Sequence, residues 1–313
     1  MPQYLGIDTS NYTTSIALYN SDNGSLIQSK KLLPVKEGEL GLRQSDAVFN
    51  HVKQLPEILK NLKCDIPSIK AVGVSIKPRW QEGSYMPCFL VGEAIGETVS
   101  KFANCDLYKS SHQVGHILAA LHSCGRLKLL NDKKPFLAFH VSGGTTDCLL
   151  VTPNDDFVIT AEEIATSLDL KAGQLIDRIG LMLGLRFPCG KELEVLASES
   201  TATFNVKPTM KGNNCCLSGI ENKCAKMLQD GVDKRDVALF TLKSIESAIY
   251  KMTKLAIEQY GDMPIVYAGG VMSDKLIRNS LMKFESYFAE PEFSCDNASG
   301  LAIYAAVKDG CEL

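Results

Sequence analysis

The most restrictive feature of this sequence is an internal duplication. Residues 7–14 (IDTSNYTT) and residues 140–147 (HVSGGTTD) occupy corresponding places in the two halves of the chain. Each segment ends a short apolar strand, turns through small and hydroxyl-bearing residues, and enters a return strand rich in β-branched residues. A third strand is expected after each pair. The sequence therefore predicts an α/β fold with two halves, each of which opens with a β-hairpin.

Hydrophobic periodicity and turn residues define the remaining elements. In the first half we expect strands at 4–8, 13–19, 25–33, 69–76 and 106–109 and helices at 45–62, 89–102 and 113–121. In the second half we expect strands at 136–141, 146–151, 157–160, 265–268 and 286–289 and helices at 172–183, 192–197, 233–258, 273–282 and 297–307. The linker between the halves is expected at 126–135. We therefore predict an N-terminal lobe of residues 1–130, joined by a C-terminal helix at 297–313, and a C-terminal lobe of residues 131–296.

Two such units facing each other across a cleft form the two-lobed actin-like ATPase architecture, the duplicated RNase H-like fold called ASKHA. Both hairpin turns of that architecture approach the phosphates of one nucleotide. Small residues let backbone N–H groups close on an anion, and hydroxyls add further donors. A single hairpin is more often only a tight turn, but a matched pair favours nucleotide binding.

Composition places the chain among ordinary globular proteins. Hydrophobic residues make up 45% and charged residues 22%, and 313 residues are enough for two cores. The net charge of −3 does not suggest a protein that grips nucleic acid alone, although residues 30–31, 77–80 and 126–128 form small basic clusters. We expect no signal peptide, no membrane segment and, from 11 cysteines without a CxxC pair, reduced thiols in the cytoplasm.

A third glycine-containing loop follows the strand expected at 265–268. Gly269 and Gly270 would permit close approach of a ligand, and the helix that follows favours negative charge at its N-terminus. The competing interpretation is an ordinary strand-to-helix turn in which Ser273 or Asp274 caps the helix.

Two histidines and one aspartate form the predicted metal site. His112 and His116 stand at i and i+4, and on a helix they would share one face, which suits two imidazoles on one ion. An isolated HxxxH pair is more often structural. Asp296 is the candidate third ligand, with a helix N-cap as its alternative and Cys295 as a rival ligand. Two histidines and one carboxylate leave coordination positions open for substrate or water.

The order and spacing of several motifs resemble those of the TsaD/Gcp/Kae family, once classed as glycoproteases, across essentially the whole chain. The similar stretches are residues 6–10, 112–116, 141–144, 172–177, 183–185 with 188–190, 217–219, 268–271 and 296–298. The resemblance implies transfer of a threonylcarbamoyl group from threonylcarbamoyl-AMP to N6 of the adenosine beside the anticodon of tRNA. It also implies a divalent metal, iron or zinc and alternatively magnesium, held by His112, His116 and Asp296.

The resemblance further implies a site for an adenine nucleotide or acyl-adenylate. Its expected residues are Ser10, Val141, Ser142, Gly143, Gly144, Thr145, Asp177, Gly190, Gly269, Gly270 and Asp274. Val141 to Gly144 would contact the phosphates and the carbamoyl group, and Asp177 and Gly190 would border the adenosine. No catalytic residue beyond the metal and nucleotide ligands is assigned. Partners would be tRNA and a second actin-like subunit, in a homodimer or heterodimer, with the first-lobe helices as the dimer surface.

Several positions depart from the family pattern. Thr145 replaces a histidine, Asp274 replaces an asparagine, residues 10–14 lack two carboxylates, and residues 77–87 replace a glycine-proline-glycine loop. These departures are typical of a divergent paralogue. An enzyme is the favoured interpretation, and a non-catalytic nucleotide-binding scaffold or regulator is the alternative. A metalloprotease is disfavoured because the histidine pair lacks the glutamate of HExxH.

Overall fold

The structure is a computed structural model that describes residues 2–10, 12–34, 42–62, 69–295 and 297–312. The chain divides into two compact units. Unit 1 contains Met1–Lys134, Pro153–Thr160 and Glu292–Leu313, and unit 2 contains Pro135–Thr152 and Ala161–Pro291. None of the described helices is long and apolar enough to cross a membrane. Every cysteine in the described part of the chain is a free thiol.

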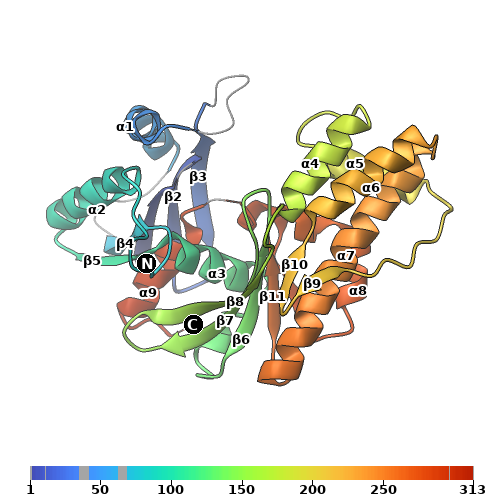
Figure 1. Ribbon diagram of the computed structural model, residues 1–313. Coiled ribbons are helices and arrows are strands. Elements are labelled where there is room, and N and C mark those ends of the chain that lie inside the picture. Colours follow the sequence, from blue (N-terminus) through green and yellow to red (C-terminus); the bar gives the residue numbers. More distant parts are fainter. Residues whose placement is uncertain (1, 11, 35–41, 63–68, 296, 313) are drawn as a thin grey trace. The chain divides into compact units, whose positions relative to one another are not determined.

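Unit 1 is built on a five-stranded sheet with the order β3-β2-β1-β4-β5 (Figure 1). The strands are β1 (Gln3–Thr9), β2 (Thr13–Asn20), β3 (Leu26–Leu32), β4 (Ile69–Lys77) and β5 (Asp106–Ser111). The helices are α1 (Gln44–Asn61), α2 (Phe89–Ala103), α3 (His112–Ser123) and α9 (Ser299–Lys308), with a 3-10 turn at Leu127–Leu130 inside the expected linker. Strands β1, β4 and β5 run parallel, and β2 pairs antiparallel with β1 and β3.

Unit 2 repeats this arrangement with the order β12-β11-β6-β7-β8. Its strands are β6 (Phe136–Val141), β7 (Thr146–Asn154), β8 (Val158–Thr166), β11 (Ile265–Ala268) and β12 (Ser286–Phe288), with a separate hairpin of β9 (Thr209–Lys211) and β10 (Asn214–Cys216). Its helices are α4 (Ala172–Met182), α5 (Gly190–Ser198), α6 (Ser218–Gln229), α7 (Lys234–Tyr260) and α8 (Lys275–Leu281), with 3-10 turns at Gly270–Ser273 and Pro291–Phe293. When the five strands of each sheet are numbered in chain order, both sheets have the spatial order 3-2-1-4-5. The duplicated actin-like fold predicted from the sequence is therefore confirmed.

Three expectations for unit 2 were wrong in detail. The third strand was expected at 157–160 but runs from Val158 to Thr166. The helix expected at 273–282 is a 3-10 turn followed by the shorter α8. Helix α6 and the β9–β10 hairpin were not predicted, because α6 buries only Cys224 and each hairpin strand has three residues. Short or mainly polar elements leave no periodic apolar signal.

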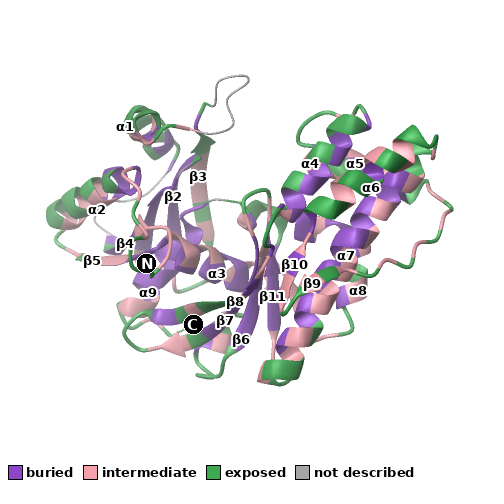
Figure 2. Ribbon diagram, viewed as in Figure 1, coloured by how far each residue is buried: buried purple, intermediate pink, exposed green. Residues whose placement is uncertain are grey.

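The C-terminal helix α9 fixes the core of unit 1. Eight of its residues are buried, and it packs against β1, β4 and α3 (Figure 2). At its crossing with α3 the two backbones touch, since a Cβ on Gly300 would overlap the carbonyl oxygen of Gly115. Gly115 lies between His112 and His116 in the sequence. Close packing of α9 therefore sets the position of the helix that carries both histidines.

Candidate functional site

Helix α3 brings the two predicted metal-binding histidines together. Ser111 is its N-cap and accepts a hydrogen bond from the backbone N–H of Val114 at 3.3 Å. The α-helical spacing places both imidazoles on one face. The Nε2 atoms of His112 and His116 lie 2.9 Å apart. Both histidines therefore lie on one capped helix, and their Nε2 atoms come close together.

A buried carboxylate orients one of these imidazoles. Asp8, at the end of β1, is fully buried, and its Oδ1 accepts a hydrogen bond from the hydroxyl of Ser75. His112 Nδ1 lies 3.1 Å from Asp8 Oδ1 and 3.2 Å from Oδ2. An ionised carboxylate can only accept, so His112 donates from Nδ1 and presents the Nε2 lone pair toward His116. The site residues predicted from the sequence did not include Asp8, although an aspartate ending an apolar strand was a visible signal.

The donor set fits a metal ion. Zinc–imidazole bonds are about 2.0–2.1 Å long and their geometry is tetrahedral, so two nitrogens on one zinc ion are about 3.3 Å apart. The observed 2.9 Å is a few tenths of an ångström shorter, a difference that a small rotation of either ring removes. A carboxylate on the far ring nitrogen is the usual partner of a metal-binding histidine. The third predicted ligand, Asp296, lies outside the described residues. Within the described ranges no group of three or more His, Cys, Asp or Glu side chains is arranged to hold a metal.

The first hairpin turn, after β1, is held by helix α2. Thr9 Oγ1 donates to the carbonyl of Cys88 at 2.9 Å and accepts from the N–H of Gly92 at 3.0 Å. The next residue, the predicted nucleotide ligand Ser10, is buried, and its hydroxyl has no hydrogen-bond partner among the described atoms. A buried hydroxyl without a partner is costly in a finished protein core. Ser10 is therefore available to an additional ligand.

In unit 2 the second hairpin turn gathers backbone donors. The N–H groups of Gly144 and Thr145 both donate to Ser142 Oγ at 3.2 Å, and Ser142 Oγ lies 2.9 Å from Thr145 Oγ1. A Cβ added to Gly143 or Gly144 would meet no described atom within 4 Å. Protein packing therefore does not require these two glycines, whereas a ligand approaching the backbone would. Val141, which precedes the turn, is buried in β6.

Helix α4 begins against this turn. The N–H of Gly173 donates to the carbonyl of Ser142 at 3.1 Å, and a Cβ on Gly173 would lie 2.5 Å from the nitrogen of Gly143. The N–H of Ala172 donates to Thr146 Oγ1 at 2.9 Å. The positive end of the helix dipole therefore lies beside the turn, as an anion-binding site requires.

Asp177 and Gly190 lie together in unit 2. Asp177 Oδ1 accepts from the N–H of Cys189 at 2.9 Å, and Gly190 opens α5. Burial raises the pKa of Asp177, and the Cys189 hydrogen bond opposes that effect. The carboxylate thus links α4 to the start of α5. This structural contact accounts for Asp177 without a nucleotide.

The glycine-containing loop after β11 agrees in part with the interpretation as a strand-to-helix turn that ends in a helix cap. Gly269 has φ +101°, and a side chain there would overlap Val141 O and lie 2.6 Å from Val141 C. Packing on β6 therefore explains Gly269, whereas a Cβ on Gly270 would meet no described atom. Asp274 caps α8 and accepts from the N–H of Ile277 at 3.0 Å.

Asp274 is an unusual carboxylate for its position. Burial raises its pKa to about 6, and Glu194 and Glu246 act in the same direction against the N–H of Ile277. The negative charge that the sequence places here is therefore costly within unit 2 itself.

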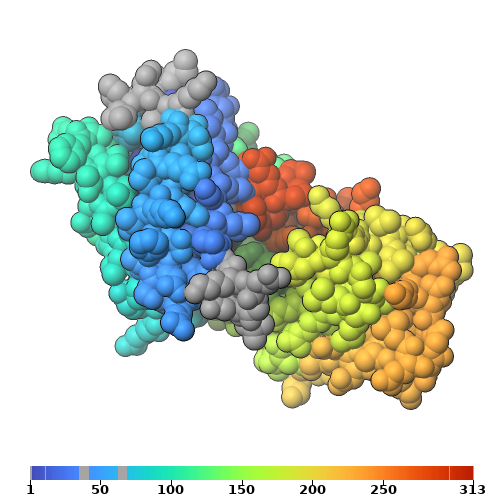
Figure 3. Space-filling view, turned by 90° about the horizontal axis from the view of Figure 1, so that it is seen from above, coloured from blue at the N-terminus to red at the C-terminus, as the bar shows by residue number. Residues whose placement is uncertain are grey.

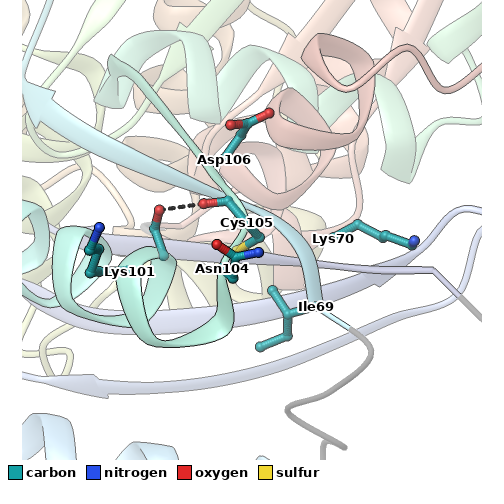
Figure 4. Close-up of a pocket in the computed structure, with 7 residues that line it drawn as sticks. Ile69, Lys70, Lys101, Asn104, Cys105 and Asp106 are labelled. Carbon is teal, nitrogen blue, oxygen red and sulfur yellow. Dashed lines mark hydrogen bonds between the residues drawn. The ribbon is translucent and has the colours of Figure 1, made fainter.

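A pocket of about 510 Å³ in unit 1 lies elsewhere (Figure 4). Its lining comes from the start of β4, the end of α2 and the start of β5: Ile69, Lys70, Ser100, Lys101, Asn104, Cys105 and Asp106. These residues stand at the amino ends of parallel strands, whereas Asp8 and His112 stand at the carboxyl ends. Open α/β sheets bind ligands at the carboxyl ends. The pocket is therefore a poor candidate for the functional site.

Comparisons with known proteins identify a family and a fold for this chain. The family model "TsaD: tRNA N6-adenosine threonylcarbamoyltransferase" matches residues 41–302. Component A of (R)-2-hydroxyglutaryl-CoA dehydratase from Acidaminococcus fermentans is 16% identical with a TM-score of 0.59, and the match covers 99% of each chain. HypF from T. kodakarensis is 9% identical with a TM-score of 0.60, over 99% of this chain and 47% of that one. The activator of 2-hydroxyisocaproyl-CoA dehydratase from Clostridium difficile, solved with ADPNP, is 12% identical with a TM-score of 0.54, over 98% and 95%.

At these identities the solved structures establish the fold alone, and that fold is the actin-like ATPase class. The family match spans most of the sequence. The chain therefore belongs to the TsaD family, whose model describes tRNA N6-adenosine threonylcarbamoyltransferases.

Proposed function

We propose that this chain is a metal-dependent transferase that moves the threonylcarbamoyl group of threonylcarbamoyl-AMP to N6 of the adenosine beside the anticodon of tRNA. The observation that supports this most directly is the convergent pair His112 and His116, oriented by buried Asp8, in a member of the TsaD family. In the reaction, the N6 amine forms a bond with the carbamoyl carbon, the carbon–oxygen bond to AMP breaks, and the amine proton is lost.

His112, His116 and Asp296 would hold the metal. A divalent ion there would stabilise negative charge that develops on a carbonyl or phosphate oxygen. Asp8 keeps the Nδ1 proton of His112 in place, so that Nε2 stays available as a ligand. Ser75, by donating to Asp8, holds that carboxylate in position. Iron and zinc both suit imidazole and carboxylate ligands.

The adenylate would be held chiefly by the turn at Ser142–Thr145. On ligand binding, the N–H groups of Gly144 and Thr145 would exchange Ser142 Oγ for phosphate oxygens, next to the start of α4. Ser10 would contribute its buried hydroxyl, and Gly270 would allow close approach of the ligand. Asp177, Gly190, Gly269 and Asp274 would shape the surroundings, since their described contacts are with protein atoms.

The direct test mixes metal-loaded protein with threonylcarbamoyl-adenylate and unmodified tRNA, and assays the digested tRNA for threonylcarbamoyladenosine by mass spectrometry. We expect product with the wild-type chain and none with His112→Ala. The matched control is His122→Gln, a change on the same helix to a histidine that packs between Tyr19 and Phe293. Tight nucleotide binding without product would contradict the transferase and favour a nucleotide-binding scaffold.

A second actin-like subunit is the proposed protein partner. Helix α1, blue in Figure 3, lies at the surface of unit 1 and exposes Phe49 and Val52, while α2 exposes Leu90. Exposed apolar side chains on neighbouring helices favour a protein interface. Sedimentation of the purified chain as a dimer would indicate that the partner is a second copy, and sedimentation as a monomer would indicate a related subunit. A monomer whose solubility and partner binding are unchanged by Phe49→Glu would contradict the proposal.

A further inference from the structure

The loop that follows β4 carries an exposed group of aromatic and basic side chains. The only tryptophan of the chain, Trp80, is 39% exposed, and its ring centroid lies 5.5 Å from that of Phe157, which is 43% exposed. The ammonium of Lys77 lies 4.6 Å from the centroid of the Trp80 ring. Arg79 stands between these two residues in the sequence. We call Lys77, Arg79, Trp80 and Phe157 the aromatic platform; all four belong to unit 1.

The backbone holds both rings in place. The Trp80 loop is joined to the helix of the histidine pair, because Gln113 N donates to Pro78 O at 3.0 Å, and Arg79 N donates to Ser84 Oγ at 3.0 Å. Phe157 is presented by a γ-turn in which Ile159 N donates to Phe157 O at 2.7 Å across Val158, at φ +63°. A positive φ at a β-branched residue is strained and persists only where its surroundings enforce it. Large aromatic side chains held at the surface in this way are preorganised for a ligand.

Two lysines of the same unit contact the acidic turn that precedes Phe157. Lys133 Nζ lies 2.9 Å from Asp155 Oδ1, and Lys308 Nζ donates to the carbonyl of Asp156 at 2.8 Å. Lys77, whose ammonium lies 4.6 Å from the centroid of the Trp80 ring, is the cation in contact with the ring pair, and Glu82 follows in the loop. Exposed rings with adjacent cations match a ligand that has flat π-faces and negative phosphates, namely an unpaired RNA segment.

We propose that the aromatic platform binds an unpaired base of single-stranded RNA, which stacks on the Trp80 ring beside the inclined Phe157 ring, 55° away in plane, while Lys77 contacts a phosphate. This inference rests on the proposed function only in identifying the RNA as the loop that contains the acceptor adenosine. An exposed cation–π contact strengthens an interaction by about 2- to 5-fold, whereas a stacked base strengthens binding by about 5- to 150-fold. A base can therefore displace the Lys77 ammonium from the ring, and the ammonium is then available to a phosphate.

The single tryptophan makes the test direct. Full-length protein is titrated with a short oligoadenylate while Trp80 fluorescence is recorded, with heparin as a polyanion that lacks bases. We expect saturable quenching by oligoadenylate that weakens as salt rises, and no comparable quenching by heparin. Equal quenching by both would show binding by charge alone and would overturn the proposal. No change with oligoadenylate would also overturn it and leave protein docking as the use of this surface.

Variants are compared by anisotropy of labelled oligoadenylate, which does not depend on Trp80 as a signal. We expect Trp80→Leu to weaken binding by about 5- to 150-fold and Trp80→Phe to recover most of the loss. Lys77→Gln should reduce the salt slope by about one. Phe102→Leu, at a ring that is 88% exposed on α2, is the matched control and should leave the affinity unchanged. Equal effects of Trp80→Leu and Phe102→Leu would refute the platform.

The two proposals fail separately. The binding measurements need neither metal nor threonylcarbamoyl-adenylate, and the transfer assay detects a modified nucleoside. RNA binding that depends on Trp80, without any transfer, would contradict the proposed function and retain the platform. If Trp80→Leu changes neither the tRNA-concentration dependence nor the salt dependence of the transfer reaction, RNA binding by the aromatic platform is contradicted and the proposed function is retained.

Discussion

At the scale of single residues, Asp8 fixes the orientation of the His112 ring. A buried carboxylate that accepts from His112 raises the basicity of the opposite ring nitrogen and fixes the ring. We expect Asp8→Asn, which keeps the side-chain volume and an acceptor for Ser75, to weaken metal affinity about 10- to 100-fold. Competition with a chelating dye measures this affinity. Asp22→Asn, at an exposed turn, should have no effect, and equal affinities in the two variants would refute the role of Asp8.

Asp274 makes stability depend on pH in a defined direction. Its pKa is about 6 in the folded protein against 3.8 as the ordinary value, so between these values the folded state binds more protons than the unfolded state. Its contribution to stability is therefore greatest below about pH 4 and falls, by about 3 kcal/mol in all, as pH rises past 6.

We expect Asp274→Asn to remove this dependence, because asparagine stays neutral and caps a helix as well as aspartate does. Urea unfolding should show the variant to be more stable than wild type by about 1–3 kcal/mol near pH 8, and nearly equal to it near pH 4. A variant that is less stable than wild type near pH 8 would show that the charged form is favoured in the folded state.

Residue contacts could be predicted from sequence only where they are local. The i, i+4 spacing of His112 and His116 and the cap at Ser111 follow from helix geometry alone, and the structure has both. Asp8 and His112 are 104 positions apart, so no periodic pattern connects them. At Gly269 a close packing contact and a close ligand contact would both require glycine, so the sequence cannot distinguish the two causes. The position of Val141 in the structure identifies packing as the cause.

At the scale of elements, the packing of α9 on α3 supports the candidate metal site. Because a Cβ on Gly300 would overlap Gly115 O, Gly300→Ala must push the two helices apart. We expect it to lower the free energy of unfolding by about 1–3 kcal/mol and to weaken metal binding. Gly219→Ala on α6, where a Cβ meets open space, is the control and should raise stability by about 0.4–1 kcal/mol. Unchanged stability in Gly300→Ala would mean that the helices do not touch there.

Most helices and strands were predictable because each carries its own periodic signal. Strands β6 and β11 begin and end at the expected residues, and α1 and α2 agree within one residue at each end. The missed elements lie between α5 and α7, where buried apolar residues are sparse. Their existence depends on tertiary contacts, among them the hydrogen bonds of Asp169 to Leu217 and Ser218 at the start of α6.

At the scale of the whole molecule, the duplication was readable because it repeats hairpin, sheet and helix in the same order. The sheets confirm it strand by strand. The assignment of the C-terminal segment to unit 1 also follows from chemistry, since α9 is apolar on all sides and needs a core to enter. Net charge of −3 is a property of the whole chain and does not reveal the local group of Lys77 and Arg79 beside Trp80.

The shared metal ion of His112 and His116 is the feature on which the proposed function depends. The most direct measurement is metal content per chain by elemental mass spectrometry, for wild type, His112→Ala, His116→Ala and the control His122→Gln. We predict one ion per chain in wild type and in the control, and loss of the ion in both alanine variants while the fold, followed by circular dichroism, is retained. Full metal content in a folded His112→Ala or His116→Ala chain would contradict the claim.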